Sequence, residues 1–211
     1  IYDEDGHEYT FIADQSITVK EGVEVANGKT ETVALKDVYE AQGDLVITKT
    51  IGGDVTAEEA EGALEFTVTR DNNGTTEYLT ADGEFTETET KLTLKTTKTD
   101  GTDLWTYDAD NNKWTATWTG IEVGDVKVTE TNTVIHIGGP DAVYTPITDG
   151  DNASVTEAEG TVTISGELTL DLTDYYEAPK GSLIITKTVE GPVSEEEAEG
   201  AQSFLVTTTV D

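Results

Sequence analysis

The sequence contains no cysteine and no methionine among its 211 residues. Without cysteine the chain has no disulfides and no thiolate-bound metal, so an exported protein of this composition needs another source of stability. The missing initiator methionine leads us to expect a mature or excised piece of a protein.

Basic residues are scarce as well, with 12 lysines and arginines against 44 aspartates and glutamates, which gives a net charge of −32. A charge of this sign repels nucleic acid and anionic membrane surfaces, and it excludes both as partners. No apolar run approaches the roughly 18 residues of a membrane-spanning helix, so we expect no membrane insertion.

Valine, threonine and turn-forming pairs are abundant, and together they predict an all-β chain. Apolar residues make up 35% of the sequence, which is enough for a hydrophobic core. Pairs of aspartate or asparagine with glycine, typical of tight turns, occur at Asp5-Gly6, Asn27-Gly28, Asn73-Gly74, Asp82-Gly83, Asp100-Gly101 and Asp149-Gly150.

The sequence repeats itself at a spacing of 138 residues. Residues 43–51, Gly-Asp-Leu-Val-Ile-Thr-Lys-Thr-Ile, return at 181–189 as Gly-Ser-Leu-Ile-Ile-Thr-Lys-Thr-Val. Extended over 43–69 and 181–207, the two copies are identical at 17 of 27 positions. The segments at 16–21 and 31–40, both expected to be strands, likewise resemble those at 125–130 and 169–177.

A repeat that starts out of phase with the chain predicts three pieces. Residues 1–42 are the C-terminal part of one domain, 43–179 form a complete domain, and 180–211 are the first strands of the next. Capping boxes predict one helical turn after Thr56 and another after Ser194. Further elements are expected as strands at 76–80, 90–98, 103–107 and 113–119, a hairpin turn at 108–112 and a surface loop at 138–153.

Lys49 is in line with apolar side chains. Alternate residues of a strand face the same side, so Lys49 shares a face with Leu45, Ile47 and Ile51. A lysine in an apolar core needs a carboxylate partner or must lose its proton. The sequence therefore predicts an acidic partner on another buried strand face.

Acidic residues occupy inward positions on two other predicted strands. Glu130 alternates with Val126 and Val128, and Asp174 alternates with the leucines before it and with Tyr176. The matching positions of the two incomplete repeats are Glu21, Asp37 and Lys187.

An apolar site favours the neutral forms of amino and carboxyl groups. Neutral lysine is a nucleophile, and a protonated aspartic acid is an electrophile that a second carboxylic acid can polarise. We therefore expect an amide between Lys49 and Asp174, formed with Glu130 as catalyst and without a cofactor. The alternatives are an ordinary buried ion pair and a lysine that reaches solvent at a sheet edge.

The motifs around these residues resemble the CnaB-type, immunoglobulin-like domains of Gram-positive adhesins and pilins. The motifs are Ile-Thr-Lys49-Thr, Val-Thr-Glu130 and Leu-Thr-Asp174-Tyr-Tyr-Glu. The resemblance implies β-sandwiches in tandem, each locked by a bond from a first-strand lysine to a last-strand asparagine or aspartate, with a glutamate assisting. Two departures are the long segment at 71–125 and the aspartate acceptor, since asparagine is the commoner one.

By the same resemblance, the inward residues of the incomplete repeats are parts of further crosslink sets. Glu21 and Asp37 would belong to an earlier domain, and Lys187 to a later one. This interpretation predicts a structural stalk or fibre segment of an adhesin or pilus on the extracellular side of a bacterial cell surface. Its expected partners are neighbouring repeats or identical subunits, joined head-to-tail, and a host ligand.

The alternative function is a ligand-binding adhesin module that contacts a glycan or host matrix. The hairpin at 105–118 or the loop at 138–153 would be its contact surface. Trp105, Tyr107, Trp114 and Trp118 share one face of that hairpin, and such stripes most often belong to a core.

Neither an enzyme nor a metal site is expected. A hydrolase with paired acids is disfavoured because these acids belong to a closed core and have a lysine partner. His7 and His136 are far apart in sequence, which disfavours zinc. Asp108, Asp110 and Asn112 have the opening spacing of a calcium loop but lack its terminal bidentate acid, so a hairpin turn is the better interpretation.

Overall fold

The computed structural model describes residues 1–12, 27–28, 30, 32–140, 142–179, 183–192, 194–198 and 205–206. The chain divides into two units, Ile1–Pro179 and Lys180–Asp211. Its elements in chain order are β1 (Tyr9–Phe11), β2 (Tyr39–Gly53), α1 (Ala57–Glu61), β3 (Glu65–Asn72), β4 (Thr75–Leu79), β5 (Phe85–Thr86), β6 (Leu92–Thr93), β7 (Trp105–Asp108), β8 (Lys113–Glu122), β9 (Gly124–Asn132), β10 (Ile135–His136), β11 (Val143–Tyr144), β12 (Glu157–Val162), β13 (Glu167–Tyr176) and α2 (Glu195–Ala198).

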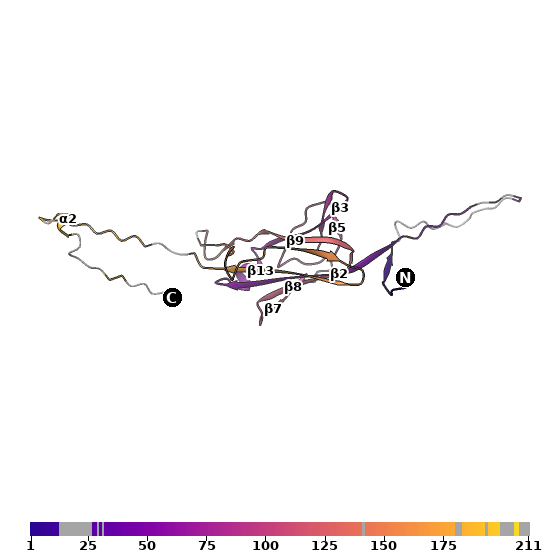
Figure 1. Cartoon of the computed structure of the whole chain (residues 1–211), viewed down its shortest axis with the longest axis horizontal. Helices are drawn as coiled ribbons and strands as arrows, with labels where there is room; N and C mark the ends of the chain where they lie inside the picture. Colours follow the sequence, from indigo (N-terminus) through magenta and orange to yellow (C-terminus); the bar gives the residue numbers. More distant parts are fainter. Residues whose placement is uncertain are drawn as a thin grey trace. The chain divides into compact units, whose positions relative to one another are not determined.

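The first unit is built from two larger sheets (Figure 1). In one sheet, β2 has β8 on one side and β13 on the other, β7 pairs with β8, and β1 pairs with the start of β2. The other sheet has the order β12-β9-β3-β4-β5, with β6 beside β3. Strands β10 and β11 form a separate pair. The predicted all-β architecture is confirmed.

Strands β2 and β13 are parallel neighbours, although they begin and end the sandwich in sequence. Their register pairs Leu45 with Leu168 and Ile51 with Asp174. Every other pairing between named strands is antiparallel in the part of the chain described. Because the first and last strands of this domain are neighbours, the chain enters and leaves the domain through the same sheet.

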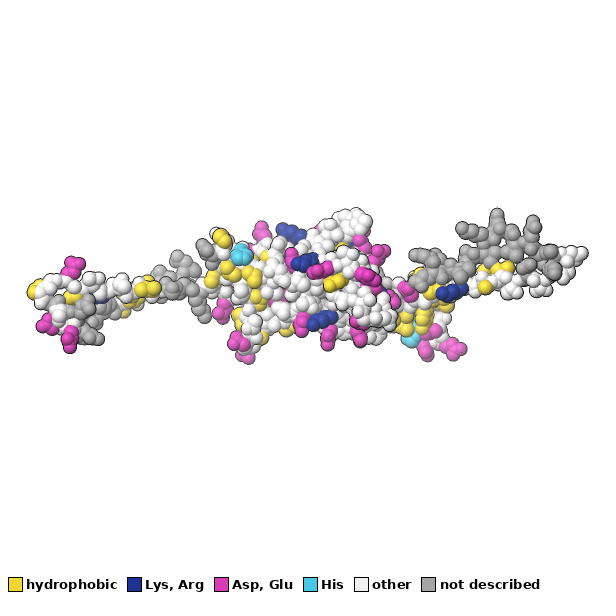
Figure 2. Space-filling view, turned by 90° about the horizontal axis from the view of Figure 1, so that it is seen from above, with side chains coloured by type: hydrophobic (Ala, Val, Ile, Leu, Met, Phe, Trp, Pro, Cys, Tyr) yellow, Lys and Arg dark blue, Asp and Glu magenta, His cyan; other side chains and the backbone are white. Residues whose placement is uncertain are grey.

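Inward side chains of both large sheets form one hydrophobic core, as expected when two sheets pack face to face. Ile47 and Leu172 contribute from the sheet of β2, and Phe66 and Val128 contribute from the opposite sheet. Outward positions are largely polar, and Figure 2 shows acidic side chains spread over the visible surface of the first unit. None of the helices described here is long and apolar enough to cross a membrane.

Strand β2 runs without interruption through the predicted boundary between residues 42 and 43. A register irregularity against β8 lies between Gly43 and Leu45. Gly43 is required there, because a β-carbon would lie 2.2 Å from the Thr163 carbonyl oxygen. The end of the first predicted piece, from Tyr39, therefore continues without a break into the strand that carries Lys49.

The helical turn predicted after Thr56 is confirmed as α1. The Thr56 hydroxyl accepts a hydrogen bond from the backbone N–H of Glu59, and the Glu59 carboxylate accepts one from the Thr56 backbone N–H. This reciprocal pair is the predicted capping box. The turn predicted after Ser194 is also present, as α2, with the same two bonds between Ser194 and Glu197.

Two strand predictions differ from the structure. The strand expected at 90–98 is limited to Leu92–Thr93, because Thr93 and Thr96 bond to each other through backbone and hydroxyl groups and turn the chain. Within the described part of 31–40, strand β2 starts only at Tyr39. The strand expected at 16–21 lies outside the described residues.

Candidate crosslink site

Lys49 is fully buried in the middle of β2, with 0% of its surface exposed. Its neighbours across the sheet are Leu172 of β13 and Trp114 of β8. Leu45, Ile47 and Ile51 are buried on the same face, so the predicted alternation is confirmed. The lysine is a core residue and does not reach solvent at a sheet edge.

Two carboxyl groups contact the Lys49 ammonium. The Nζ atom lies 2.8 Å from Oε2 of Glu130 and 2.8 Å from Oδ2 of Asp174. Asp174 belongs to β13 on the same sheet, whereas Glu130 projects from β9 on the opposite sheet. The predicted set of lysine, glutamate and aspartate is thus brought together across the core, with all three side chains buried.

The cluster holds one basic group and two acidic groups away from water. Burial raises the pKa of Glu130 to about 8, although the Lys49 ammonium acts in the opposite direction and the Asp174 carboxyl raises it further. Oε1 of Glu130 and Oδ1 of Asp174 have no hydrogen-bond partner among the described residues. A protonated carboxyl group tolerates this setting better than a carboxylate does.

Tyr176 is a fourth member of the cluster and was predicted only as an inward residue. Its hydroxyl oxygen lies 2.8 Å from Oδ2 of Asp174 and 2.9 Å from the Thr133 carbonyl oxygen. Burial and the adjacent Asp174 raise the pKa of Tyr176, which keeps its hydroxyl protonated. Its place two residues after Asp174 on one strand face was the only sequence signal for this contact.

The three site residues of the incomplete repeats are not assembled in this way. Asp37 and Lys187 are exposed, and Glu21 lies outside the described residues. The inward orientation expected for Asp37 is therefore not seen, and its neighbours Val33 and Leu35 are exposed too. The physical reason is that no lysine strand pairs with 32–38 in the described part of the chain.

The tryptophans of the hairpin formed by β7 and β8 belong to the core. Trp105, Trp114 and Trp118 are buried, and the Trp118 indole N–H donates to the Thr80 carbonyl oxygen. Tyr107 is 42% exposed and packs on Trp114 with ring centroids 4.6 Å apart. The core interpretation of this stripe is confirmed, and a platform of exposed tryptophan rings is excluded.

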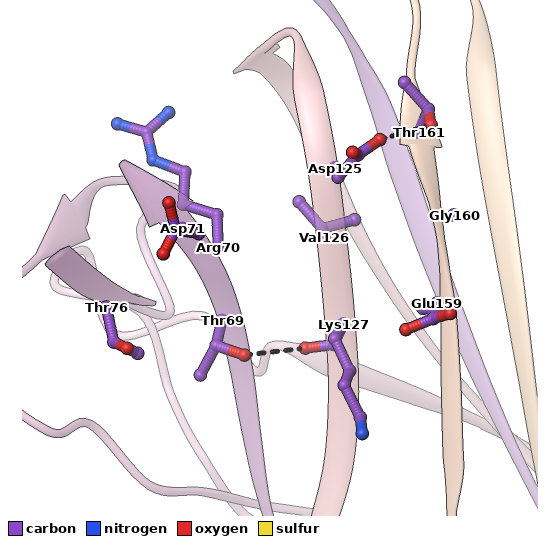
Figure 3. Close-up of a pocket in the computed structure, with 10 residues that line it drawn as sticks. All are labelled: Thr69, Arg70, Asp71, Thr76, Asp125, Val126, Lys127, Glu159, Gly160 and Thr161. Carbon is purple, nitrogen blue, oxygen red and sulfur yellow. Dashed lines mark hydrogen bonds between the residues drawn. The ribbon is translucent and has the colours of Figure 1, made fainter. Parts of the chain in front are cut away.

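A groove of about 530 Å³ lies on the other sheet, over β3, β4, β9 and β12 (Figure 3). Its wall includes the acidic residues Asp71, Asp125 and Glu159 and one lysine, Lys127. Lys127 forms an ion pair with Glu157 at 2.8 Å, so its charge is already matched within the protein. The groove contains none of the crosslink residues.

One group of possible metal ligands occurs among the described residues, at Asp3, Asp5 and His7. Both oxygens of Asp3 already accept hydrogen bonds, from the backbone of Asp5 and His7 and from the side chains of His7 and Tyr9. These bonds, led by that of the His7 ring, lower the pKa of Asp3 to about 2. The group forms a turn in which both carboxylate oxygens of Asp3 are occupied.

The residues with calcium-loop spacing form the turn between β7 and β8, as predicted. Oδ1 of Asp108 accepts a hydrogen bond from the Asp110 backbone N–H at 3.0 Å. Asn112 adopts a positive φ of 48°, which asparagine tolerates well in tight turns.

Comparisons with known proteins give no close relative. No protein-family model and no curated protein matches the chain. Among solved structures, it is similar to the minor pilin GBS52 of Streptococcus agalactiae, with 15% identity over 77% of this chain and a TM-score of 0.35. It is also similar to the pilus-presented adhesin Spy0125 (Cpa), with 16% identity over 68% of this chain and a TM-score of 0.33.

The chain spans 61% of the minor pilin's length and 30% of the adhesin's length. TM-scores this low do not establish a shared fold. The architecture described above therefore rests on the strand pairing and burial within this chain.

Proposed function

We propose that the chain is a segment of a repetitive extracellular stalk or fibre, of a bacterial adhesin or pilus, whose domains are locked by self-formed amide bonds. The observation that carries this proposal is the contact of the buried Lys49 ammonium with both Glu130 and Asp174 at 2.8 Å. The surface location comes from the resemblance of the three motifs to CnaB-type domains.

The reaction joins Lys49 to Asp174 and releases water. A neutral lysine attacks the Asp174 carboxyl carbon, while protonated Glu130 polarises that group and relays a proton to the departing oxygen. Contact within a folded core supplies an effective molarity that can reach on the order of 10⁵ M, so no cofactor is needed. The chain would catalyse this single event on itself and turn over no substrate.

The product suits a load-bearing role. Because β2 opens the domain and β13 closes it, tension between the chain connections would pass through the Lys49–Asp174 amide and bypass the residues between them. The bond also restricts the unfolded chain, and the loop-closure relation for disulfides gives roughly 4–5 kcal/mol for a loop of this length. This crosslink takes the place of the missing disulfides.

Intact mass of the denatured protein tests the proposal. Condensation of lysine with aspartic acid removes one water, so the wild-type chain is expected about 18 Da below its sequence mass. The deficit is expected to vanish in Lys49→Ala and in Glu130→Ala. A full sequence mass in the wild type would leave a buried ion pair and contradict the proposal.

The incomplete repeats extend the proposal to assembly. Leu183, Ile184 and Ile185 are exposed, although they copy the sequence of a buried strand. We expect the incomplete domain that begins with the Lys187 segment to be completed by a segment like the one that carries Glu21 and Asp37. That segment would come from a neighbouring repeat or an identical subunit. Head-to-tail fibres with intermolecular crosslinks would follow.

Denaturing gels test this assembly at high protein concentration. A ladder of covalent multimers is expected for the wild type, and Lys187→Ala should abolish the ladder while leaving the internal 18 Da deficit, roughly one water, in place. Monomers alone for the wild type would show that these segments do not complete one another between subunits.

A ligand-binding adhesin module remains the second candidate, supported by the open groove over β3, β4, β9 and β12 and by the exposed Tyr107 ring. Host-matrix or glycan binding that is lost on Tyr107→Ala or on Glu159→Ala, with an unchanged thermal unfolding curve, would favour it. Trp118→Ala is unsuitable because that side chain is buried.

A further inference from the structure

The Tyr176 hydroxyl stands between two oxygen atoms and has one hydrogen to donate. The Thr133 carbonyl oxygen, at 2.9 Å, can only accept a hydrogen bond. Oδ2 of Asp174, at 2.8 Å, accepts when the group is ionised and donates when it carries a proton. The two contacts are satisfied together only if Tyr176 donates to Thr133 and accepts from a protonated Asp174.

The opposite arrangement leaves the cluster poorly matched. If Tyr176 donated to an ionised Asp174, the Thr133 carbonyl would lose its partner. The titratable groups placed against Asp174 by the described residues are Lys49 of β2, Glu130 of β9 and Tyr176 of β13 itself.

We propose that Tyr176 is a catalytic residue of the crosslinking reaction, which holds the reacting proton on Oδ2 of Asp174. The inference rests on the proposed crosslink between Lys49 and Asp174. It assigns the tyrosine the task of keeping the aspartic acid neutral, and therefore electrophilic, inside a site that also contains an ammonium.

The reaction sequence balances with this assignment. The reaction starts from a neutral Lys49 amine and the acid form of Glu130, whose Oε2 lies 2.8 Å from Nζ. The Nζ–Cγ bond forms and the Cγ–Oδ2 bond breaks. Oδ2 leaves as water with two protons: its own, which is hydrogen-bonded to the Tyr176 hydroxyl, and one that Glu130 delivers. Glu130 recovers its proton from the nitrogen, and Oδ1 of Asp174 becomes the amide oxygen.

Tyr176→Phe tests the role, since it removes the hydroxyl and retains the buried ring. The full chain is made by cell-free translation, quenched into denaturant at intervals, and weighed to follow the loss of about 18 Da. We expect at least a tenfold slower loss, because the variant lacks the hydroxyl oxygen that lies 2.8 Å from Oδ2 of Asp174 and holds its proton. Tyr175→Phe, on the opposite face of the same strand, is the matched control and should behave as the wild type.

The same Tyr176 change in an Asp174→Asn chain distinguishes a role in holding the Asp174 proton from a role in packing alone. An asparagine at 174 carries its hydrogens at every pH and reacts with loss of ammonia, about 17 Da. In Asp174→Asn the added Tyr176→Phe change is expected to slow the reaction much less and to leave its pH profile unchanged. Equal slowing in both backgrounds would show a structural role and overturn the inference.

If Tyr176→Phe fails to fold, as judged by circular dichroism, 3-fluorotyrosine at position 176 keeps the shape and weakens the hydroxyl oxygen as an acceptor. A slower loss of water is expected, and an unchanged rate and pH profile overturns the inference. A wild-type chain that never loses water would contradict the proposed function itself. A wild type and a Tyr176→Phe variant that lose water at the same rate would overturn only the role of Tyr176.

Discussion

The two copies of the lysine segment, at 43–51 and 181–189, have nearly the same sequence, but the two lysines have opposite surroundings. Lys49 is fully buried, whereas Lys187 is exposed. Leu45 and Ile47 are 0% and 1% exposed, while their counterparts Leu183 and Ile185 are 66% and 60% exposed.

The difference lies in the partners of each strand. Strand β2 is flanked by β8 and β13 and faced by β9, and no strand is formed by 183–190 in the described part of the second unit. Alternation therefore encodes which side chains share a face. Burial of that face requires the neighbouring strands.

Replacing each lysine by alanine is expected to give the largest difference between the two copies. Lys49→Ala is expected to lower the free energy of unfolding by about 5 kcal/mol or more, because it removes the crosslink and leaves two buried carboxyl groups unmatched. Lys187→Ala, an exposed change in the same sequence context, should stay within about 0.5 kcal/mol. Chemical denaturation of dilute, monomeric protein measures both, and equal effects would contradict the contrast between the copies.

The pH dependence of crosslinking reports on the buried carboxyl group of Glu130, which contacts Lys49. Burial raises the pKa of Glu130 to about 8, so its acid form persists through neutral pH and is lost as the pH rises through that value. The rate of water loss is therefore expected to stay constant up to about pH 8 and to fall at higher pH. Mass time courses across pH 5–10, with roughly one-unit steps, check this expectation. A rate that rises steadily above pH 8 would contradict a role for the acid form of Glu130.

The two capping boxes give the smallest expected effect. Thr56→Ala removes a cap inside the sandwich unit and is expected to cost about 1 kcal/mol in its unfolding. Ser194→Ala removes the equivalent cap in the second unit, so the main unfolding transition should not move. A thermal melt that shifts equally for both variants would mean that the two units unfold together.

Much of the site could be predicted because its residues follow strand alternation. Lys49, Glu130 and Asp174 were each expected to face inward from different strands, and the structure places them in mutual contact. A period of two is a local property of the chain and is readable without an alignment.

The remaining parts depend on contacts that alternation does not encode. The partner of the Tyr176 hydroxyl is a backbone carbonyl at Thr133, just after β9, and its position depends on how that loop leaves the strand. The strand expected at 90–98 is cut short because threonine hydroxyls compete with neighbouring strands for backbone bonds. Exposure of Asp37 depends on which strand lies beside it, which its own sequence does not state.

Peptide mapping of the wild-type protein tests the Lys49–Asp174 amide most directly. Trypsin does not cleave after a lysine whose amine is in an amide, so we expect residues 37–70 linked to residues 128–180 as one species about 18 Da below the sum of the two peptides. Fragmentation should place the link at Lys49 and Asp174. Separate peptides 37–49, 50–70 and 128–180 at full mass would contradict the account.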